Sequence, residues 1–170
     1  MKVKAVVHKG KEGLEGVFVT EMEEPQPSAD EVKIRLKVAG LNHRDLFVPF
    51  RHGQDEPAII LGSDGAGVVE AVGENVSNVK VGDEVVIIPS LGWKKTSSAP
   101  PKGFEILGLP DHGTFAEKIV VPAENAVPKP TKLTWEEAGV LPLAALTGYR
   151  ALFTRGKLES GQHVLIPGIG

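Results

Sequence analysis

Glycine and proline recur so often in this chain that only short segments lie between them. The 170 residues include 20 Gly and 13 Pro, and before residue 134 the segments between them are rich in β-branched and aliphatic residues. Short strands between frequent turn signals are typical of an all-β barrel or sandwich. The sequence therefore predicts a β-rich unit with few helices before residue 134.

The clearest predicted strand spans Glu31 to Val38, where aliphatic and basic residues alternate. Such alternation gives a strand one buried and one solvated face. The N-terminal MKVKAVVHKG alternates in the same way. Further strands are expected over residues 17–21, 65–72, 83–89 and 115–121. By contrast, residues 93–110 are polar and rich in proline, which favours a long exposed loop.

Helical signals begin after Pro130. Thr134 and Glu137, three residues apart, form a capping box, so a helix is expected to start there. A second helix is expected from about Thr147 to Thr154, because the Arg-Gly pair that follows suits a helix C-terminus.

The last residues have the pattern of a strand that enters a glycine turn. His163 to Ile166 is mainly aliphatic, and Gly168-Ile169-Gly170 follows. A dinucleotide-binding fold needs glycine at such a turn so that the backbone can approach a pyrophosphate at a helix N-terminus. We therefore expect a β-rich domain over residues 1–130. Residues 131–170 are expected to hold connecting helices and the first strand of a truncated second domain.

Charge and composition exclude several classes of function. The net charge is only -3 and no long block of one sign occurs, which argues against nucleic acid or an anionic membrane surface as a partner. No apolar run of about 18 residues and no signal-peptide pattern is present, so a cytoplasmic protein with no membrane partner is expected. The chain has no cysteine, which excludes disulfides, thiol catalysis and every Cys-based zinc site.

A first polar cluster, Asn42-His43-Arg44-Asp45, directly follows the strand that begins at Glu31. Functional residues often gather at such strand ends, so these four side chains are candidates for a site. In the structural alternative, Asp45 caps a short helix and the other three side chains are solvated.

A second cluster places Ser63 and Asp64 in the otherwise apolar run GSDGAGVV. The glycines are consistent with a tight turn that feeds a strand, but polar side chains in an apolar segment need partners or a function. The isolated His8 and His112 are interpreted as surface or turn residues and Tyr149 as a core residue. None of these three is placed in a site.

Six segments occur in an order and spacing that are specific when taken together. They read AGLNHRD, ILGSDGAGVVEAVGENV, VGDEV, HGTFAEKIVVPAENAVPKP, LPLAALTGYRAL and VLIPGIG. In this register they resemble the GroES-like catalytic domain of the medium-chain dehydrogenase/reductase superfamily, over essentially the whole chain. The resemblance implies a mainly β fold with flanking helices (α+β). A GroES-like, partly open β-barrel would be followed by two helices and the first strand of a Rossmann fold.

The sequence departs from the zinc-dependent alcohol dehydrogenases of this family at the three metal-ligand positions. Asn42 stands where those enzymes have Cys, Ser63 where they have His, and Leu143 where they have a second Cys. Zinc in such a site needs three ligands from Cys, His or carboxylate, so these residues cannot hold it. The resemblance therefore implies no metal, as in the zinc-independent quinone oxidoreductases and enone reductases.

For that branch the resemblance implies that quinones or activated alkenes are reduced by hydride from NADPH, with NADH as an alternative donor. The charge that forms is delocalised over an enolate or hydroquinone anion, which hydrogen-bond donors can hold. Asn42 and the ribose hydroxyls of the cofactor are the candidate donors, with Arg44 as a third candidate. Asp45, Ser63 and Asp64 complete the set of catalytic candidates.

The resemblance also implies cofactor contacts by Thr147 to the nicotinamide, His43 to the pyrophosphate, and Gly168 and Gly170 in the glycine turn. The expected substrate is a small carbonyl compound, quinone or enone, and the expected full-length protein is a homodimer. The 170 residues alone are expected to be inactive. Two alternatives stay open: a GroES-like binding or assembly module without catalysis, and a zinc-type alcohol dehydrogenase with relocated ligands.

Overall fold

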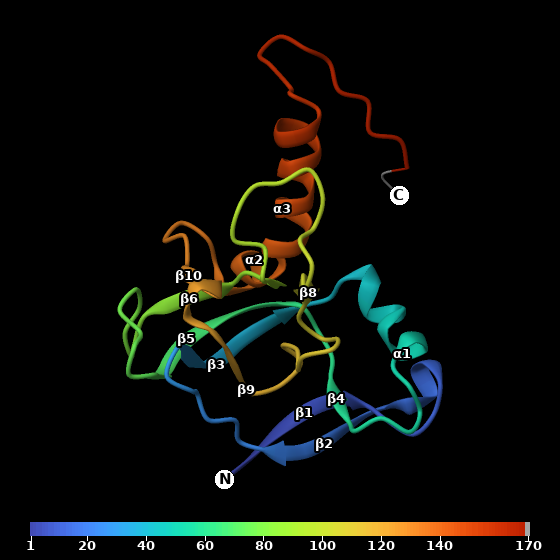
Figure 1. Cartoon of the computed structure of the whole chain (residues 1–170), viewed down its shortest axis with the longest axis vertical. Helices are drawn as coiled ribbons and strands as arrows, with labels where there is room; N and C mark the ends of the chain where they lie inside the picture. The colour runs from blue at the N-terminus through green and yellow to red at the C-terminus, as the bar shows by residue number, and fades with distance from the viewer. Residues whose placement is uncertain (169–170) are drawn as a thin grey trace.

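Frequent turns divide the chain into short strands that pair in antiparallel fashion (Figure 1). The computed structural model describes residues 1–168. Within them the strands are β1 Lys2–His8, β2 Val17–Glu23, β3 Glu31–Gly40, β4 Ile59–Ile60, β5 Asp64–Val72, β6 Glu84–Ile87, β7 Ser90–Leu91, β8 Glu105–Ile106, β9 Lys118–Pro122 and β10 Ala126–Pro128. They form one sheet in the order β2-β1-β4, a larger sheet in the order β10-β6-β5-β3-β9, and the hairpin β7-β8.

The helices are short and lie mainly after the barrel. They are α1 Val48–Arg51, α2 Trp135–Val140 and α3 Pro142–Tyr149, with 3-10 turns at Gly13–Gly16, His43–Leu46 and Ala123–Asn125 and a π-helical turn at Arg150–Arg155. The expected mainly β architecture with flanking helices is confirmed. Among the described helices, none is both long enough and apolar enough to cross a membrane.

Strand β3 is an inner strand of the larger sheet and pairs on both sides, with β5 and with β9. Val32 and Ile34 are 0% exposed, as the alternation of the sequence predicts. Lys33, between them, is also buried, which departs from the expected solvated face. Its ammonium lies 2.8 Å from the carboxylate of Glu24, and this pairing makes the burial tolerable.

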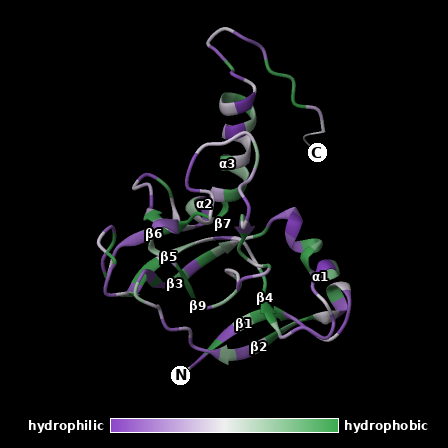
Figure 2. Cartoon of the chain, viewed as in Figure 1, coloured by the Kyte–Doolittle hydropathy of each residue, from purple (hydrophilic) through white to green (hydrophobic). Residues whose placement is uncertain are grey.

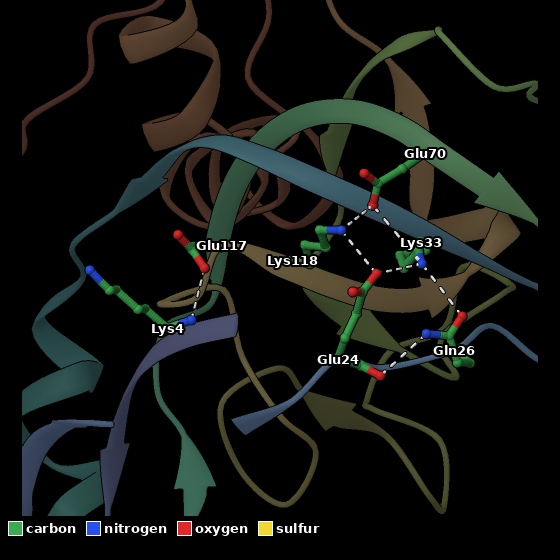
Figure 3. A network of polar contacts seen from close by, with 7 residues as sticks. All are labelled: Lys4, Glu24, Gln26, Lys33, Glu70, Glu117 and Lys118. Carbon is green, nitrogen blue, oxygen red and sulfur yellow. Dashed lines mark hydrogen bonds and ion pairs between the residues drawn. The ribbon is translucent and has the colours of Figure 1, made fainter. Parts of the chain in front are cut away.

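The two larger sheets are joined by a network of charged side chains (Figure 3). Glu24, which follows β2, lies 2.8 Å from Lys33 Nζ of β3 and 2.9 Å from Lys118 Nζ of β9. Lys118 Nζ also lies 2.9 Å from Glu70 Oε2 of β5, in an ion pair that lacks hydrogen-bond geometry. Hydrogen bonds from Lys33 and Lys118 lower the pKa of Glu24 to about 2.

Backbone contacts join β1 to the segment before β9. Val6 N donates to Phe115 O at 2.8 Å, and Ala5 forms an isolated bridge with Ala116. The neighbouring turn is very tight, because a Cβ on Gly113 would lie 2.0 Å from Gly62 O. This approach holds Gly62, and with it the start of β5, in one place.

The capping box at Thr134 is confirmed. Thr134 Oγ1 accepts from Glu137 N at 3.2 Å, Glu137 Oε2 accepts from Thr134 N at 2.9 Å, and α2 begins at the next residue. The second helix starts at Pro142, so the predicted start near Thr147 is wrong. Proline is favoured in the first turn of a helix because an N–H at that position has no helical partner.

Residues 163–166 form no strand, and Leu165 is 90% exposed, so the predicted strand is wrong for the described chain. A strand needs a neighbour for its backbone hydrogen bonds, and within residues 1–168 no strand pairs with this segment. The segment lies beyond α3, away from the sheets, and Figure 2 colours most of it as hydrophobic.

Candidate functional site

The two polar clusters of the sequence come together because β3 and β5 pair in antiparallel register. Gly40 at the end of β3 lies opposite Asp64 at the start of β5. The residues just after β3 therefore meet the residues that open β5. Asn42 Nδ2 donates to Asp64 Oδ2 at 3.0 Å across this junction.

Asp64 is 0% exposed and receives hydrogen bonds on both carboxylate oxygens. Leu143 N, in the first turn of α3, donates to Asp64 Oδ1 at 2.9 Å. Thr114 Oγ1 donates to the backbone oxygen of Asp64 at 2.8 Å. Burial raises the pKa of Asp64, while the bonds from Asn42 and Leu143 oppose that rise. The carboxylate thus fixes α3 and Asn42 relative to the barrel.

Asp45 has the structural role that the sequence left open. Asn42 is the N-cap of the 3-10 turn His43–Leu46, and Asn42 N donates to Asp45 Oδ2 at 2.7 Å. Asp45 Oδ1 is buried and has no hydrogen-bond partner among residues 1–168. Burial raises the pKa of Asp45. The Ser63 hydroxyl is close enough to moderate this pKa, but its position does not satisfy Oδ1.

Arg44 brings a half-buried positive charge into the same cluster. Its Nη1 donates to Ser63 Oγ and to Leu107 O, each at 2.8 Å. Burial lowers the pKa of the guanidinium, while Asp45 raises it. A guanidinium remains charged under all physiological conditions, so the cluster contains a fixed cation.

Beside this cluster, α3 and the segment from Pro89 to Ile106 enclose a pocket of about 370 Å³. We call it the α3 pocket. Leu143 lines it and also donates to Asp64, so the pocket adjoins the polar cluster. Thr147, one helical turn later, lines it too, and its Oγ1 donates to Leu143 O at 2.8 Å.

The structure brings five of the candidate residues together. Asn42, Arg44, Asp45, Ser63 and Asp64 form one connected cluster. His43 is exposed and packs edge-on against Phe47, and Gly168 is exposed with a φ of +77°. Gly170 lies outside the described residues.

Sequence reasoning missed several members of the site. Thr114 and the carbonyl of Leu107 belong to it through contacts between distant segments, which no local pattern reports. Tyr149 is 60% exposed and lines the α3 pocket, so its predicted place in the core is wrong. His8 is fully buried against His52, with 2.8 Å between their Nδ1 atoms, so its predicted place at the surface is wrong too.

The residues at the three expected metal-ligand positions do not fit zinc. Asn42 and Ser63 offer neutral oxygen or nitrogen atoms, Leu143 offers none, and Arg44 adds a cation that repels a metal ion. Within residues 1–168, no three His, Cys, Asp or Glu side chains are grouped so that they could hold a metal ion.

Comparison with known proteins gives the family. The model described as "Alcohol dehydrogenase GroES-like domain" matches residues 28–131. The chain is 34% identical to a zinc-type alcohol dehydrogenase-like protein of Schizosaccharomyces pombe, covering 100% of this chain and 51% of that protein. It is 34% identical to a crotonyl-CoA carboxylase/reductase of Cereibacter sphaeroides, over 86% of this chain and 38% of that protein.

Solved structures of oxidoreductases have the same fold as this chain. An NAD-dependent alcohol dehydrogenase superposes with a TM-score of 0.84 at 38% identity, over 95% of this chain and 49% of that chain. A quinone oxidoreductase of Pseudomonas syringae gives a TM-score of 0.71 at 28% identity, over 92% of this chain and 42% of that chain. The chain spans about half the length, or less, of these relatives. The chain therefore belongs to the alcohol dehydrogenase GroES-like domain family, within the medium-chain dehydrogenase/reductase superfamily of oxidoreductases.

Proposed function

We propose that this chain is the substrate-binding part of an oxidoreductase that reduces enones or quinones with NADPH and without a metal ion. NADH is the alternative donor. The observation that carries the proposal is the hydrogen-bonded cluster at the positions where zinc enzymes of the family hold their metal. There the carboxylate of Asp64 binds Asn42 and Leu143, and the guanidinium of Arg44 binds Ser63.

This chemistry needs less charge stabilisation than alcohol oxidation does. A bound NAD(P)H would supply a hydride to the β-carbon of the enone, and the electron pair of the C=C bond would move towards the carbonyl oxygen. The resulting enolate takes a proton from water at its α-carbon. Hydrogen-bond donors are sufficient to hold such a delocalised anion, whereas a localised alkoxide benefits from a Lewis acid.

Asn42 and Arg44 are the proposed donors to that oxygen. The amide nitrogen of Asn42 has two hydrogens, and Asp64 accepts one of them, which leaves the other for substrate. Arg44 has five N–H groups, and the bonds to Ser63 and Leu107 use only Nη1. Asp45, Ser63 and Asp64 act in this proposal by fixing the two donors.

The nicotinamide is proposed to lie against the exposed side of α3 at Thr147, which is open to solvent and borders the α3 pocket. This placement fits the residues present, because the helix offers a hydroxyl and small side chains beside the polar cluster. His43 and the glycine turn at Gly168 and Gly170 are proposed contacts for the rest of the cofactor. A cytoplasmic homodimer also belongs to this proposal, and light scattering tests the dimer.

The test uses the protein at the length of its relatives, treated with a chelator and then assayed with NADPH against enones, quinones and alcohols. We expect enone or quinone reduction that zinc does not stimulate. Asn42→Leu should lower kcat by about 100–1,000-fold, the range for loss of one oxyanion donor. Zinc-dependent alcohol oxidation as the main activity would overturn the proposal, and the absence of any nicotinamide binding would favour a binding module instead.

A further inference from the structure

The lining of the α3 pocket is mainly apolar. Three aromatic side chains line it, namely Trp93 and Phe104 from the loop and Tyr149 from α3. Trp93 and Phe104 pack edge to face, with ring centroids 5.1 Å apart. Rings held in this way favour a planar apolar group between them and the helix.

The lining of the same pocket also carries positive charge. Lys94, Lys95 and Arg150 belong to its lining, and none of its described lining residues is Asp or Glu. Lys94 is already paired with Glu124, 3.0 Å away. The free part of the charge therefore lies at Lys95 and Arg150.

Arg150 is held in place without being neutralised. Its guanidinium lies 4.4 Å from the centroid of the Trp93 ring, and its Nη2 donates to Ser97 O at 2.9 Å. Neither contact supplies a negative charge. Most of its N–H groups remain for an anion, and a fixed guanidinium loses little entropy when it binds one.

We propose that the α3 pocket selects substrates that join a flat apolar body to an anionic group, carboxylate or phosphate, with Arg150 as the residue that binds the anion. This inference rests on the proposed function, because it assigns the reacting end of the same substrate to Asn42. Leu143 marks the position of Asn42 on the helix, because Asp64 accepts hydrogen bonds from both residues. Arg150 follows Leu143 by seven residues. At 1.5 Å per helical residue, the anion lies about 10 Å from the reacting carbonyl along the helix.

The test compares two enones of the same shape, 4-carboxybenzylideneacetone and its methyl ester, in the intact protein with NADPH. We expect kcat/KM to be about tenfold higher for the acid, which corresponds to one charge-assisted hydrogen bond. Arg150→Gln should bring the acid-to-ester ratio of kcat/KM down to about one, a fall of about tenfold, while Arg150→Lys should keep part of the preference.

Arg155→Gln is the matched control. Arg155 donates to Ser98 O at 3.2 Å on the same loop but does not line the pocket, so its loss should leave the preference unchanged. A preference for the ester, or an unchanged ratio in Arg150→Gln, would overturn the inference. So would an equal loss with both probes, because Arg150 would then only hold the loop.

Calorimetry without nicotinamide separates this inference from the proposed reaction. The probes are the same acid and ester, titrated into the unmodified protein and into Arg150→Gln. If the acid binds more tightly than the ester and Arg150→Gln removes the difference, the pocket assignment is supported. If neither enone is then turned over, enone reduction is rejected. Turnover of both enones at equal rates, with equal binding, would reject the pocket assignment and leave enone reduction in place.

Discussion

Asp64 is the residue on which the hydrogen bonds of the site converge. It is buried at the start of β5, and both of its carboxylate oxygens accept, one from Asn42 Nδ2 and one from Leu143 N. A buried acceptor that faces two donors cannot be replaced by an amide without conflict. The amide would turn an NH₂ group towards one of the donors.

We therefore expect Asp64→Asn to lower the free energy of unfolding by about 1–3 kcal/mol, the cost of leaving a buried donor unpaired. Urea unfolding at neutral pH measures it. Asp30→Asn is the control, since its exposed Oδ1 accepts a single bond, 3.0 Å long, from Asn75. Equal stability of the Asp64 variant and the parent would show that the two bonds contribute nothing net.

For individual residues, the sequence predicted which side chains form the polar cluster but not which groups they bind. Ser63 and Asp64 were conspicuous because polar side chains seldom occur in an apolar run, and such side chains need partners. The partners themselves, Leu143 N and Leu107 O, are backbone groups from distant segments. Backbone groups carry no sequence signal, so only the fold could identify them.

Among the elements, the contact between α2 and β3 depends on glycine. A Cβ on Gly139 of α2 would lie 2.6 Å from Val38 Cγ1 of β3, closer than real side chains approach. Gly148 in α3 is also helical, but apart from its chain neighbours and the backbone of its own helix, no described atom would lie within 4 Å of an added Cβ. The two glycines therefore respond to alanine in opposite ways.

Gly139→Ala is expected to lower the free energy of unfolding by about 1–3 kcal/mol, because the helix must move off the sheet. Gly148→Ala is expected to raise it by about 0.5–1 kcal/mol, because alanine loses less backbone entropy in a helix. Urea unfolding of both variants measures this. Two changes of the same sign would contradict the packing of α2 on the sheet.

The ion network around Glu24 makes the attachment between the two larger sheets dependent on pH. The side chain of Glu24 is only 7% exposed, and its carboxylate lies 2.8 Å from Lys33 Nζ and 2.9 Å from Lys118 Nζ. The pKa of Glu24 falls from 4.5 to about 2 on folding. Between these values the unfolded chain binds more protons, so this contribution to stability is complete above pH 4.5 and lost as pH falls towards 2.

Glu24→Gln should therefore weaken the dependence of the free energy of unfolding on pH between about 4.5 and 2. Urea midpoints at a series of pH values measure it. Glu21→Gln is the control, since Glu21 is 61% exposed and lies 3.9 Å from Lys2. A pH profile for Glu24→Gln that parallels that of the parent would contradict the role of the network.

The strands were more predictable than the helices that follow them. Alternation and turn residues act within a few positions, so β3 and β5 were expected near their observed places. The start of α3 was missed because the prediction relied on its C-terminal signal and overlooked Pro142. The segment 163–166 has strand composition, but composition cannot supply the neighbouring strand that pairing requires.

Over the whole molecule, large apolar side chains are exposed along α3 and the turn that follows it. Leu146, Tyr149 and Phe153 are each at least 45% exposed, and Ile166 beyond them is 57% exposed. Exposed apolar side chains of this density commonly mark a surface that contacts another domain or partner. The proposed position of the nicotinamide lies on this same helix, at Thr147.

The 170-residue chain alone is therefore expected not to oxidise NADPH in the presence of an enone. Its described residues supply the proposed oxyanion donors and one wall of the cleft, but they form no strand after α3 on which a dinucleotide could lie. NADPH absorbance followed with benzylideneacetone measures this, with the protein at its relatives' length as the positive control. If the short chain turned over at a comparable rate, hydride transfer would have to occur within the barrel and α3, and the placement of the cofactor at Thr147 would need to be abandoned.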